Sequence, residues 1–254
     1  MEATDFIIQQ RGGENAPRQL FVATLRSIQV GMPRTFGSTD ATDRMDSPWT
    51  TGFFKEPVVG PVRVGLCNLE GDGQADLVNH GGPEKAINVY PLEHYSYWEH
   101  SLGLADLPYG AFGENFTMIG CLESDVCIGD IFTVGEAVVQ ISQPRQPCWK
   151  LSRRWRIRDF ALKVQETGRT GWYFRVLKEG SVEAGAPMVL TQRPYPQWTV
   201  QAANQVMHQC PQDVDAARRL LNCHLLSERW RETLRKRIAT GRINSGTARL
   251  FGPN

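Results

Sequence analysis

The 254-residue sequence has few of the features that mark several large classes of protein. Its 28 Lys and Arg residues nearly balance its 27 Asp and Glu residues, and the formal net charge of +1 gives no bulk electrostatic reason to expect binding to nucleic acid or to an anionic membrane surface. No stretch reaches the ~18 consecutive apolar residues of a membrane span, and the N-terminus lacks the basic-then-apolar pattern of a secretory signal. We therefore expect a cytoplasmic protein that binds neither nucleic acid nor membrane.

Motifs for metal clusters and nucleotides are also scarce. The six cysteines form neither a CxxC pair nor the C-x4-C-x2-C spacing of a ferredoxin-type iron–sulfur cluster. The five histidines include no HxxxH or HExxH pattern, which argues against a zinc hydrolase of that type. A Gly-rich dinucleotide fingerprint is missing as well, and in the cytoplasm the thiols are expected to be reduced.

Hydrophobic residues make up 41% of the chain, enough for a sizeable core, and their pattern divides the sequence into three parts. Residues 1–19 are polar and unpatterned and are predicted to be a loose N-terminus. Residues 20–193 carry mainly strand patterns, whereas residues 197–240 carry three amphipathic helix patterns after the break Pro194-Tyr195-Pro196. We therefore expect a mainly β domain with some helix (an α+β fold), followed by a small three-helix unit.

The strongest local pattern is a β-hairpin at 130–142. Two apolar runs flank Gly135-Glu136, and glycine in the first position of a two-residue loop favours a type II′ turn. Residues 34–47 are rich in Thr, Asp, Ser and Gly and are predicted to be a loop, either a functional lid or a mobile insertion. Further strands are expected at 21–30, 58–66, 86–90, 172–177 and 188–190, helices at 92–102 and 159–167, and helix caps at Asp159, Asp213 and Ser227.

Cys148 lies just past this hairpin, on a loop that is stiffened by Pro144 and Pro147. Arg145 and Lys150 are close to it in sequence, and basic neighbours lower the pKa of a thiol. A thiol with a low pKa and a fixed direction suits a metal ligand or a nucleophile. The alternative is a buried, inert cysteine, and the spacing alone leaves both readings open.

Three further segments are candidate parts of a site. In His80-Gly81-Gly82, which is followed by Lys85, the paired glycines can present backbone N–H groups as a nest for an oxyanion. Asn115 offers a donor and an acceptor to the edge of a heterocycle. Asp130, at the start of the hairpin, can accept a proton or orient a ligand. Each of these segments is equally well explained as an ordinary turn.

Taken in order, these segments resemble the MOSC domain, which is also found at the C-terminus of molybdenum cofactor sulfurase. The resemblance runs from about residue 20 to the C-terminus. More narrowly, the sequence is similar to the bacterial YiiM type, in which a three-helix region follows the MOSC domain. It implies a strongly curved β-sheet or barrel over residues 20–193. It is carried by Gly71-Asp72-Gly73-Gln74-Ala75-Asp76, His80-Gly81-Gly82-Pro83, Tyr90-Pro91, His94-Tyr95, Phe112-Gly113-Glu114-Asn115, Gly129-Asp130, Gln143-Pro144-Arg145 and Pro147-Cys148.

The resemblance also implies a chemistry. MOSC proteins bind the molybdenum cofactor, a pterin dithiolene carrying Mo (Mo-molybdopterin), and some of them reduce N-hydroxylated compounds such as N-hydroxylated purine bases and amidoximes. The family's cysteine falls on Cys148, which would ligate Mo as a soft thiolate. Because the chain has no cluster motif of its own, the expected electron donor is an external flavoprotein or iron–sulfur reductase. The oligomeric state stays open, a homo-oligomer included.

Roles for individual residues follow from the same resemblance. Lys55 would bind the cofactor's phosphate together with the glycine nest, Asn115 would bind the pterin edge, and Asp130 would act beside Cys148 as a catalytic residue that moves protons or holds the substrate. The expected cofactor-binding residues are Thr51, Lys55, His80, Gly81, Gly82, Lys85, Asn115, Arg145, Lys150 and Arg154.

Two other functions remain as alternatives. The chain would be a molybdenum-cofactor or sulfur carrier if Cys148 served only as a docking or persulfide thiol. It would be a hydrolase if Cys148 were a nucleophile paired with His80, although nothing in the sequence brings these two residues together.

Overall fold

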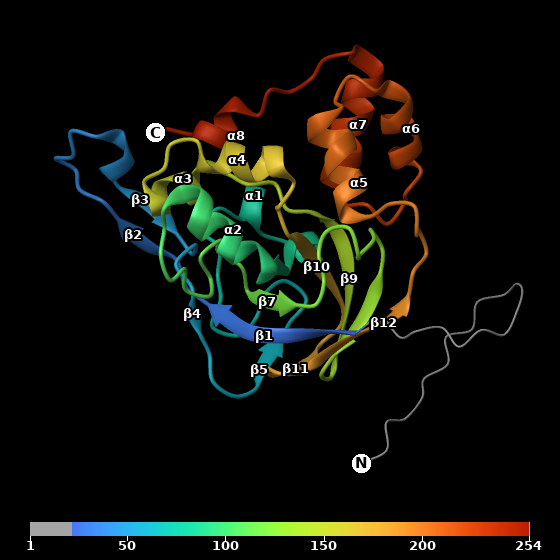
Figure 1. The fold of residues 1–254 in the computed structure, drawn as a ribbon, viewed down its shortest axis with the longest axis horizontal. Helices are drawn as coiled ribbons and strands as arrows, with labels where there is room; N and C mark the ends of the chain where they lie inside the picture. Colours follow the sequence, from blue (N-terminus) through green and yellow to red (C-terminus); the bar gives the residue numbers. More distant parts are fainter. Residues whose placement is uncertain (1–21, 254) are drawn as a thin grey trace, which may run out of the picture.

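The computed structural model describes residues 22–253, so the loose N-terminus expected at 1–19 lies outside the described residues. Its centre is an eight-stranded sheet in the order β12-β8-β9-β10-β6-β7-β1-β4, and an additional pairing of β12 with β1 closes seven of these strands into a barrel (Figure 1). The pairing of β6 with β7 is parallel, so the sheet is mixed. This arrangement confirms the expected fold class. The sheet strands are β1 (Val22–Val30), β4 (Glu56–Pro57), β6 (Ile87–Pro91), β7 (Phe116–Ile119), β8 (Ile131–Val134), β9 (Ala137–Pro144), β10 (Trp172–Lys178) and β12 (Pro187–Gln192).

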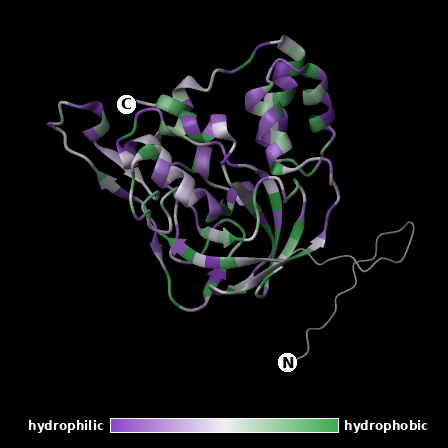
Figure 2. Ribbon diagram, in the orientation of Figure 1, coloured by the Kyte–Doolittle hydropathy of each residue, from purple (hydrophilic) through white to green (hydrophobic). Residues whose placement is uncertain are grey.

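Alternation of apolar and polar residues along the strands explains the barrel's interior (Figure 2). In β1, a register shift between Leu25 and Ser27 breaks the regular alternation, and Ile28 is therefore turned into the core. The hairpin predicted at 130–142 is present, with Val134 opposite Ala137 and Gly135 at φ +54°, as a turn with glycine in its first position requires.

A second, aromatic core lies where three helices pack above the barrel in the view of Figure 1. These helices are α2 (Glu93–Leu102), α3 (Trp149–Trp155) and α4 (Phe160–Thr167). At its centre the rings of Tyr90 and Phe112 stack with their centroids 4.0 Å apart. Helices α2 and α4 confirm the predictions at 92–102 and 159–167. Asp159 occupies the N-cap position of α4 as expected, but its side chain makes no capping hydrogen bond and pairs with Lys163 instead.

The C-terminal helices share the main hydrophobic core with the barrel and do not form a separate one. Asp213 caps α6 as expected, by accepting a hydrogen bond from the backbone N–H of Ala216 at 2.8 Å. Ser227 occupies the N-cap position of α7 as expected, but its hydroxyl donates to Oε1 of Gln143 in β9 at 2.7 Å and so ties α7 to the barrel instead of capping the helix. The helices of this unit are α5 (Val200–Asn204), the π-helical turn η3 (Gln205–Gln209), α6 (Val214–Leu221) and α7 (Glu228–Thr240).

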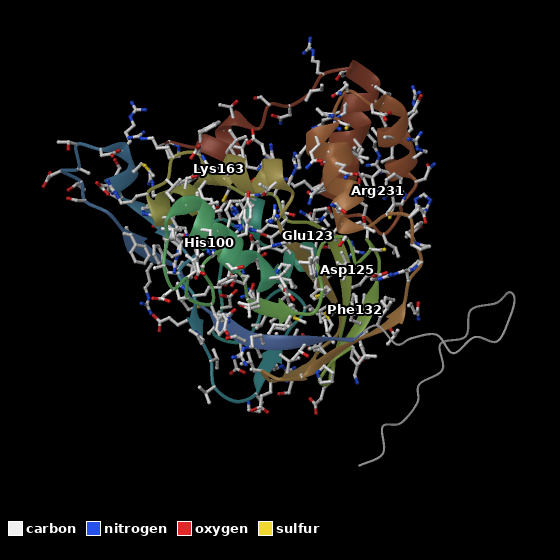
Figure 3. The ribbon with its side chains drawn as sticks, viewed as in Figure 1. His100, Glu123, Asp125, Phe132, Lys163 and Arg231 are labelled. Carbon is white, nitrogen blue, oxygen red and sulfur yellow. The ribbon has the colours of Figure 1, made fainter. Side chains whose placement is uncertain are left out.

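The buried carboxylate of Glu123 links α2 to the start of β10. Glu123, labelled in Figure 3, accepts a hydrogen bond from the backbone N–H of Gly171 at 2.7 Å, and its other oxygen lies 2.7 Å from Nε2 of His94. These contacts hold the start of β10 against α2.

The segment 34–47, expected to be a loop, is more ordered than its composition suggests. It contains β2 (Arg34–Phe36), which pairs with β3 (Trp49–Thr51), and the 3-10 turn η1 (Arg44–Asp46). Arg156, at the end of α3, forms an ion pair with Asp46 and so ties this arm to the helix. Charged side chains that fit a loop by composition therefore act here as anchors.

The helices α1 (Leu77–His80), α3 and α8 (Thr247–Phe251) and the 3-10 turns η1 and η2 (Pro83–Lys85) were not predicted. The strand expected at 58–66 is reduced to β5 (Val62–Val64), paired with β11 (Gly180–Val182), because Gly60 and Pro61 interrupt it. Within residues 22–253, no helix combines the length and the apolar character needed to cross a membrane.

Candidate active site

A cavity of about 590 Å³, part of it open to solvent, lies between the barrel and the helices above it. Cys148 lines it, and so do residues from segments far apart in the chain. The structure thus brings together eight of the residues expected at the site, namely Thr51, Lys55, His80, Lys85, Asn115, Arg145, Cys148 and Lys150.

Local structure fixes the place of Cys148. Strand β9 ends at Pro144, and the backbone N–H of Arg145 donates to the carbonyl of Gly171 at 3.1 Å, which holds the chain against β10 as it leaves the sheet. Cys148 itself is in an extended conformation and immediately precedes α3. Its thiol is therefore carried between a strand and a helix, both of which are packed in the core.

The surroundings of Cys148 favour its thiolate. Burial alone would raise the pKa of this thiol, since only 7% of the residue is exposed. The hydrogen bond with His80, the electrostatic influence of His80 and Arg145, and the backbone N–H of Lys150 outweigh burial and lower the pKa of Cys148 to about 6. Nε2 of His80 lies 3.5 Å from Sγ of Cys148.

An acidic residue stands behind this histidine. Nδ1 of His80 lies 3.4 Å from Oδ2 of Asp76, close enough for an ion pair but without the geometry of a hydrogen bond, and it has no hydrogen-bond partner in the described part of the chain. Asp76 also caps α1 by accepting from the backbone N–H of Asn79 at 3.0 Å. Asp76, His80 and Cys148 therefore lie in a row, an arrangement that no motif in the sequence indicated.

The cavity also holds cations, and one of them, Arg145, has a donor without a partner in the described part of the chain. Arg145 is 3% exposed, and its Nη2 donates to the carbonyl of Phe112 at 2.9 Å, whereas its Nη1 has no hydrogen-bond partner among residues 22–253. Lys150 is 8% exposed. Burial, followed by the nearby charge of Arg229, lowers the pKa of Lys85 to about 8. Lys85 is half-buried, and its Nζ donates to the carbonyl of Asn79. Two buried cations and a third beside them suit an anionic ligand.

Two expected ligand-binding residues are already engaged with another residue. Lys55 forms a buried ion pair with Asp72, and Nδ2 of Asn115 donates to the same carboxylate at 2.9 Å. Burial lowers the pKa of Lys55, while Asp72 opposes that effect. These contacts shape the cavity wall. Asn88, which sequence reasoning missed, lines the cavity with a buried Oδ1 that lacks a partner in the described chain, and only its place in an apolar strand could have pointed to it.

Four expected site residues do not line the cavity. Asp130 is fully buried at the start of β8, where it pairs with Arg193 at 2.7 Å and accepts from the backbone N–H of Cys127 at 2.8 Å. Its expected role in proton transfer at Cys148 is therefore not supported by its position, and its contacts give it a structural one. The guanidinium of Arg154 lies over the ring of Phe54 at 4.5 Å.

Gly81 and Gly82 differ from the expected oxyanion nest. The backbone N–H of Gly81 donates to the carbonyl of Leu77 at 3.3 Å and so closes α1. Gly82 has φ +90° and turns the chain into η2, a conformation that requires glycine. The two glycines therefore place His80 and Lys85 at the cavity, but Gly81 and Gly82 themselves do not line it.

Comparison with known proteins assigns the chain to a family. The MOSC domain family matches residues 76–189, and the family described as YiiM-like, 3-alpha helix domain matches residues 198–241. Protein YflK of Bacillus subtilis is 50% identical over 211 residues, which cover 83% of this chain and 92% of that protein. Protein YiiM of Escherichia coli is 42% identical over 200 residues, covering 78% of this chain and 89% of that protein. The chain belongs to the MOSC family, in its YiiM-like form.

Structural comparison agrees with this assignment and confirms the resemblance inferred from the motifs. The crystal structure of YiiM from Geobacillus stearothermophilus superposes with a TM-score of 0.71 at 38% identity, covering 85% of this chain and 99% of that one. A protein of Gibberella moniliformis named "Reductase" is 37% identical over 161 residues, which cover 62% of this chain but only 28% of that protein.

Proposed function

We propose that the chain is a molybdenum-cofactor-dependent reductase that converts N-hydroxylated compounds, such as N-hydroxylated purine bases and amidoximes, to amines with electrons from an external reductase. The observation that carries the proposal is the placement of the Cys148 thiolate beside the unpartnered Nη1 of Arg145 in one cavity. Membership of the MOSC family and the name of the fungal relative support it.

The donor set of the cavity fits the molybdenum cofactor. A soft thiolate suits molybdenum, and the cations Arg145 and Lys150 suit the phosphate of the pterin. The buried Oδ1 of Asn88 would accept a hydrogen bond from the pterin edge. Among residues 22–253, no group of three or more His, Cys, Asp or Glu side chains could hold a metal ion by itself. One protein thiolate therefore suits a metal that arrives with its own organic ligand.

The reaction balances as R–NHOH plus two electrons and two protons, giving R–NH₂ and water. The bound cofactor would supply the two-electron chemistry at which the N–O bond breaks. The chain's own residues would hold the cofactor's phosphate and deliver protons. Lys85, whose pKa burial lowers to about 8, is suited to donate a proton from Nζ near neutral pH, which gives it the role that the position of Asp130 does not support.

The test compares the wild-type protein with Cys148→Ser, both expressed in a host that makes the cofactor. We expect near-stoichiometric molybdenum and pterin in the wild type, little of either in the variant, and reduction of N-hydroxylated purine only when a flavoprotein or iron–sulfur reductase is added. A wild type without molybdenum would contradict the proposal. Molybdenum without turnover of any N-hydroxylated compound would support a carrier instead, and turnover with NADH alone would exclude the external donor.

A second candidate function is favoured by one observation, the row formed by Asp76, His80 and Cys148. A thiol with a neighbouring imidazole and a carboxylate behind it has the parts of a nucleophile that attacks acyl groups. Cofactor-free protein and a chromogenic thioester separate the two functions. A covalent acyl group on Cys148, detected by mass spectrometry and absent from His80→Asn, would support the thiol nucleophile.

A further inference from the structure

The C-terminal helix α8 (Thr247–Phe251) follows the exposed segment 242–246 and packs against α3 and α4 (Figure 1). It lies beyond residue 241, where the match to the YiiM-like helical family ends. Leu250 is 2% exposed and anchors the helix in the protein. This short helix is therefore docked on the body of the molecule, close to the segment that carries Cys148.

Arg249 makes the most specific contacts of this helix. Its Nη1 donates to the carbonyl of Pro147, the residue directly before Cys148. Its Nη2 donates to Oε1 of Gln165 in α4 at 2.5 Å. A guanidinium with two donors in a fixed geometry holds both acceptors at once, so the carbonyl of Pro147 is tied to α4 through one side chain.

The residue on the other side of Cys148 is held by the same segment. Gly252 has φ +54° and lies against Trp149, and a Cβ atom at this position would come within 2.3 Å of the indole ring. Trp149 also packs on Trp49, with the ring centroids 5.6 Å apart. Both neighbours of Cys148 in the chain are therefore in contact with residues 249–252.

We propose that residues 247–252 form a strap that positions the Cys148 thiol, with Arg249 as its positioning residue. A buried loop between a strand and a helix keeps its side-chain direction only if the flanking peptides are fixed, and the strap fixes the peptide before Cys148 and the ring after it. Arg249 does not line the cavity, and its hydrogen bonds go to Pro147 and Gln165. Burial lowers the pKa of Arg249 to about 10, and the nearby Cys148 opposes that effect. The inference rests on the proposed function only for the reaction that the thiol serves.

The experiment measures how fast iodoacetamide alkylates Cys148 in the cofactor-free full-length protein, read by peptide mass spectrometry. We expect Arg249→Gln to raise this rate roughly tenfold, because the loss of a charge-assisted hydrogen bond increases the population of the locally opened loop by about that factor. Arg249→Lys keeps a donor for the carbonyl of Pro147 and should restore most of the protection. Arg242→Gln, on the exposed segment before the strap, should change nothing.

Cys223 is the internal control, since it is fully buried in the helical unit away from the strap. An unchanged alkylation rate at Cys148 in Arg249→Gln overturns the inference. So does an equal rise at Cys148 and Cys223, which would mean general unfolding. The alkylation assay needs no molybdenum, so it tests the strap independently of the proposed function. Failure of the reductase assay would leave the alkylation result standing, and failure of the alkylation assay would leave the reductase result standing.

Discussion

Nε2 of His80 lies 3.5 Å from Sγ of Cys148, although 68 residues separate the two in the chain. The contact joins the end of α1 to the start of α3, and Gly81 and Gly82 turn the chain so that the histidine faces the thiol. An imidazole at this distance stabilises a thiolate that burial alone would disfavour. The reactivity of the cavity therefore depends on a pair of residues.

Replacing His80 should slow the chemistry of Cys148. In cofactor-free protein, we expect the alkylation rate of Cys148 to rise with pH around a midpoint near 6, the pKa of its thiol. In His80→Asn, that pKa should move above its ordinary value because burial remains while the main stabilising contact is lost. At pH 7 the alkylation rate should fall about tenfold, since a smaller thiolate fraction is partly offset by a more nucleophilic thiolate. An unshifted midpoint would contradict the assignment, and the exposed His224→Gln serves as control.

Arg145→Met should weaken ligand binding strongly and change stability little. Its buried Nη1 has no hydrogen-bond partner in residues 22–253, while its Nη2 donates to the carbonyl of Phe112, so relief of the buried charge and loss of that bond should nearly cancel in the free energy of unfolding of cofactor-free protein. The same substitution should weaken retention of the cofactor by at least about tenfold, because a charged hydrogen bond to the phosphate is lost. Urea unfolding and molybdenum content after dialysis measure the two effects. A large loss of stability would show that Arg145 is structural, and Arg158→Gln, on the exposed surface, is the matched control.

The buried pair Lys55–Asp72 should behave differently. Asp72 accepts from the ammonium of Lys55, from the backbone N–H of Gly31 at 2.9 Å and from Nδ2 of Asn115 at 2.9 Å. We expect Asp72→Ala to cost about 3 kcal/mol in the free energy of unfolding, because it leaves a buried ammonium without its partner. The double variant Lys55→Met with Asp72→Ala should cost less than Asp72→Ala alone. If the two single effects simply added, the pair would not be coupled.

Much of this fold was predictable from local patterns. The hairpin at 130–142 follows from two runs of alternating residues and a glycine turn, and the loop of Cys148 follows from the prolines around it. Helix α8 escaped prediction because a five-residue helix has no periodicity of its own and is stabilised by packing on α3 and α4.

The site was predictable in part of its membership but not in its contacts. Lys55, Asn115 and Cys148 were all expected to line one cavity, and the structure places them there. Their partners could not be deduced from the sequence. The pairing of Asp130 with Arg193 depends on β8 and β12 being neighbours in the barrel, and that of Lys55 with Asp72 depends on which two loops meet. A residue type shows what a side chain can bind, whereas only the fold shows which partner it already has.

His208, in η3, should make stability depend on pH below neutrality. Burial, followed by the charges of Arg249 and Arg237, lowers the pKa of its imidazole to about 3, and its buried Nε2 has no hydrogen-bond partner among the described residues. Between pH 6.5 and 3 the unfolded chain binds a proton that the folded chain does not, so the free energy of unfolding falls as pH is lowered through this window. We expect His208→Gln to remove roughly 2 kcal/mol of that fall, measured by urea unfolding at pH 7 and pH 4. His224→Gln, at an exposed histidine, should leave the decrease in the free energy of unfolding between pH 7 and pH 4 unchanged. If both variants changed that decrease equally, the pKa of His208 would not be lowered in the folded protein.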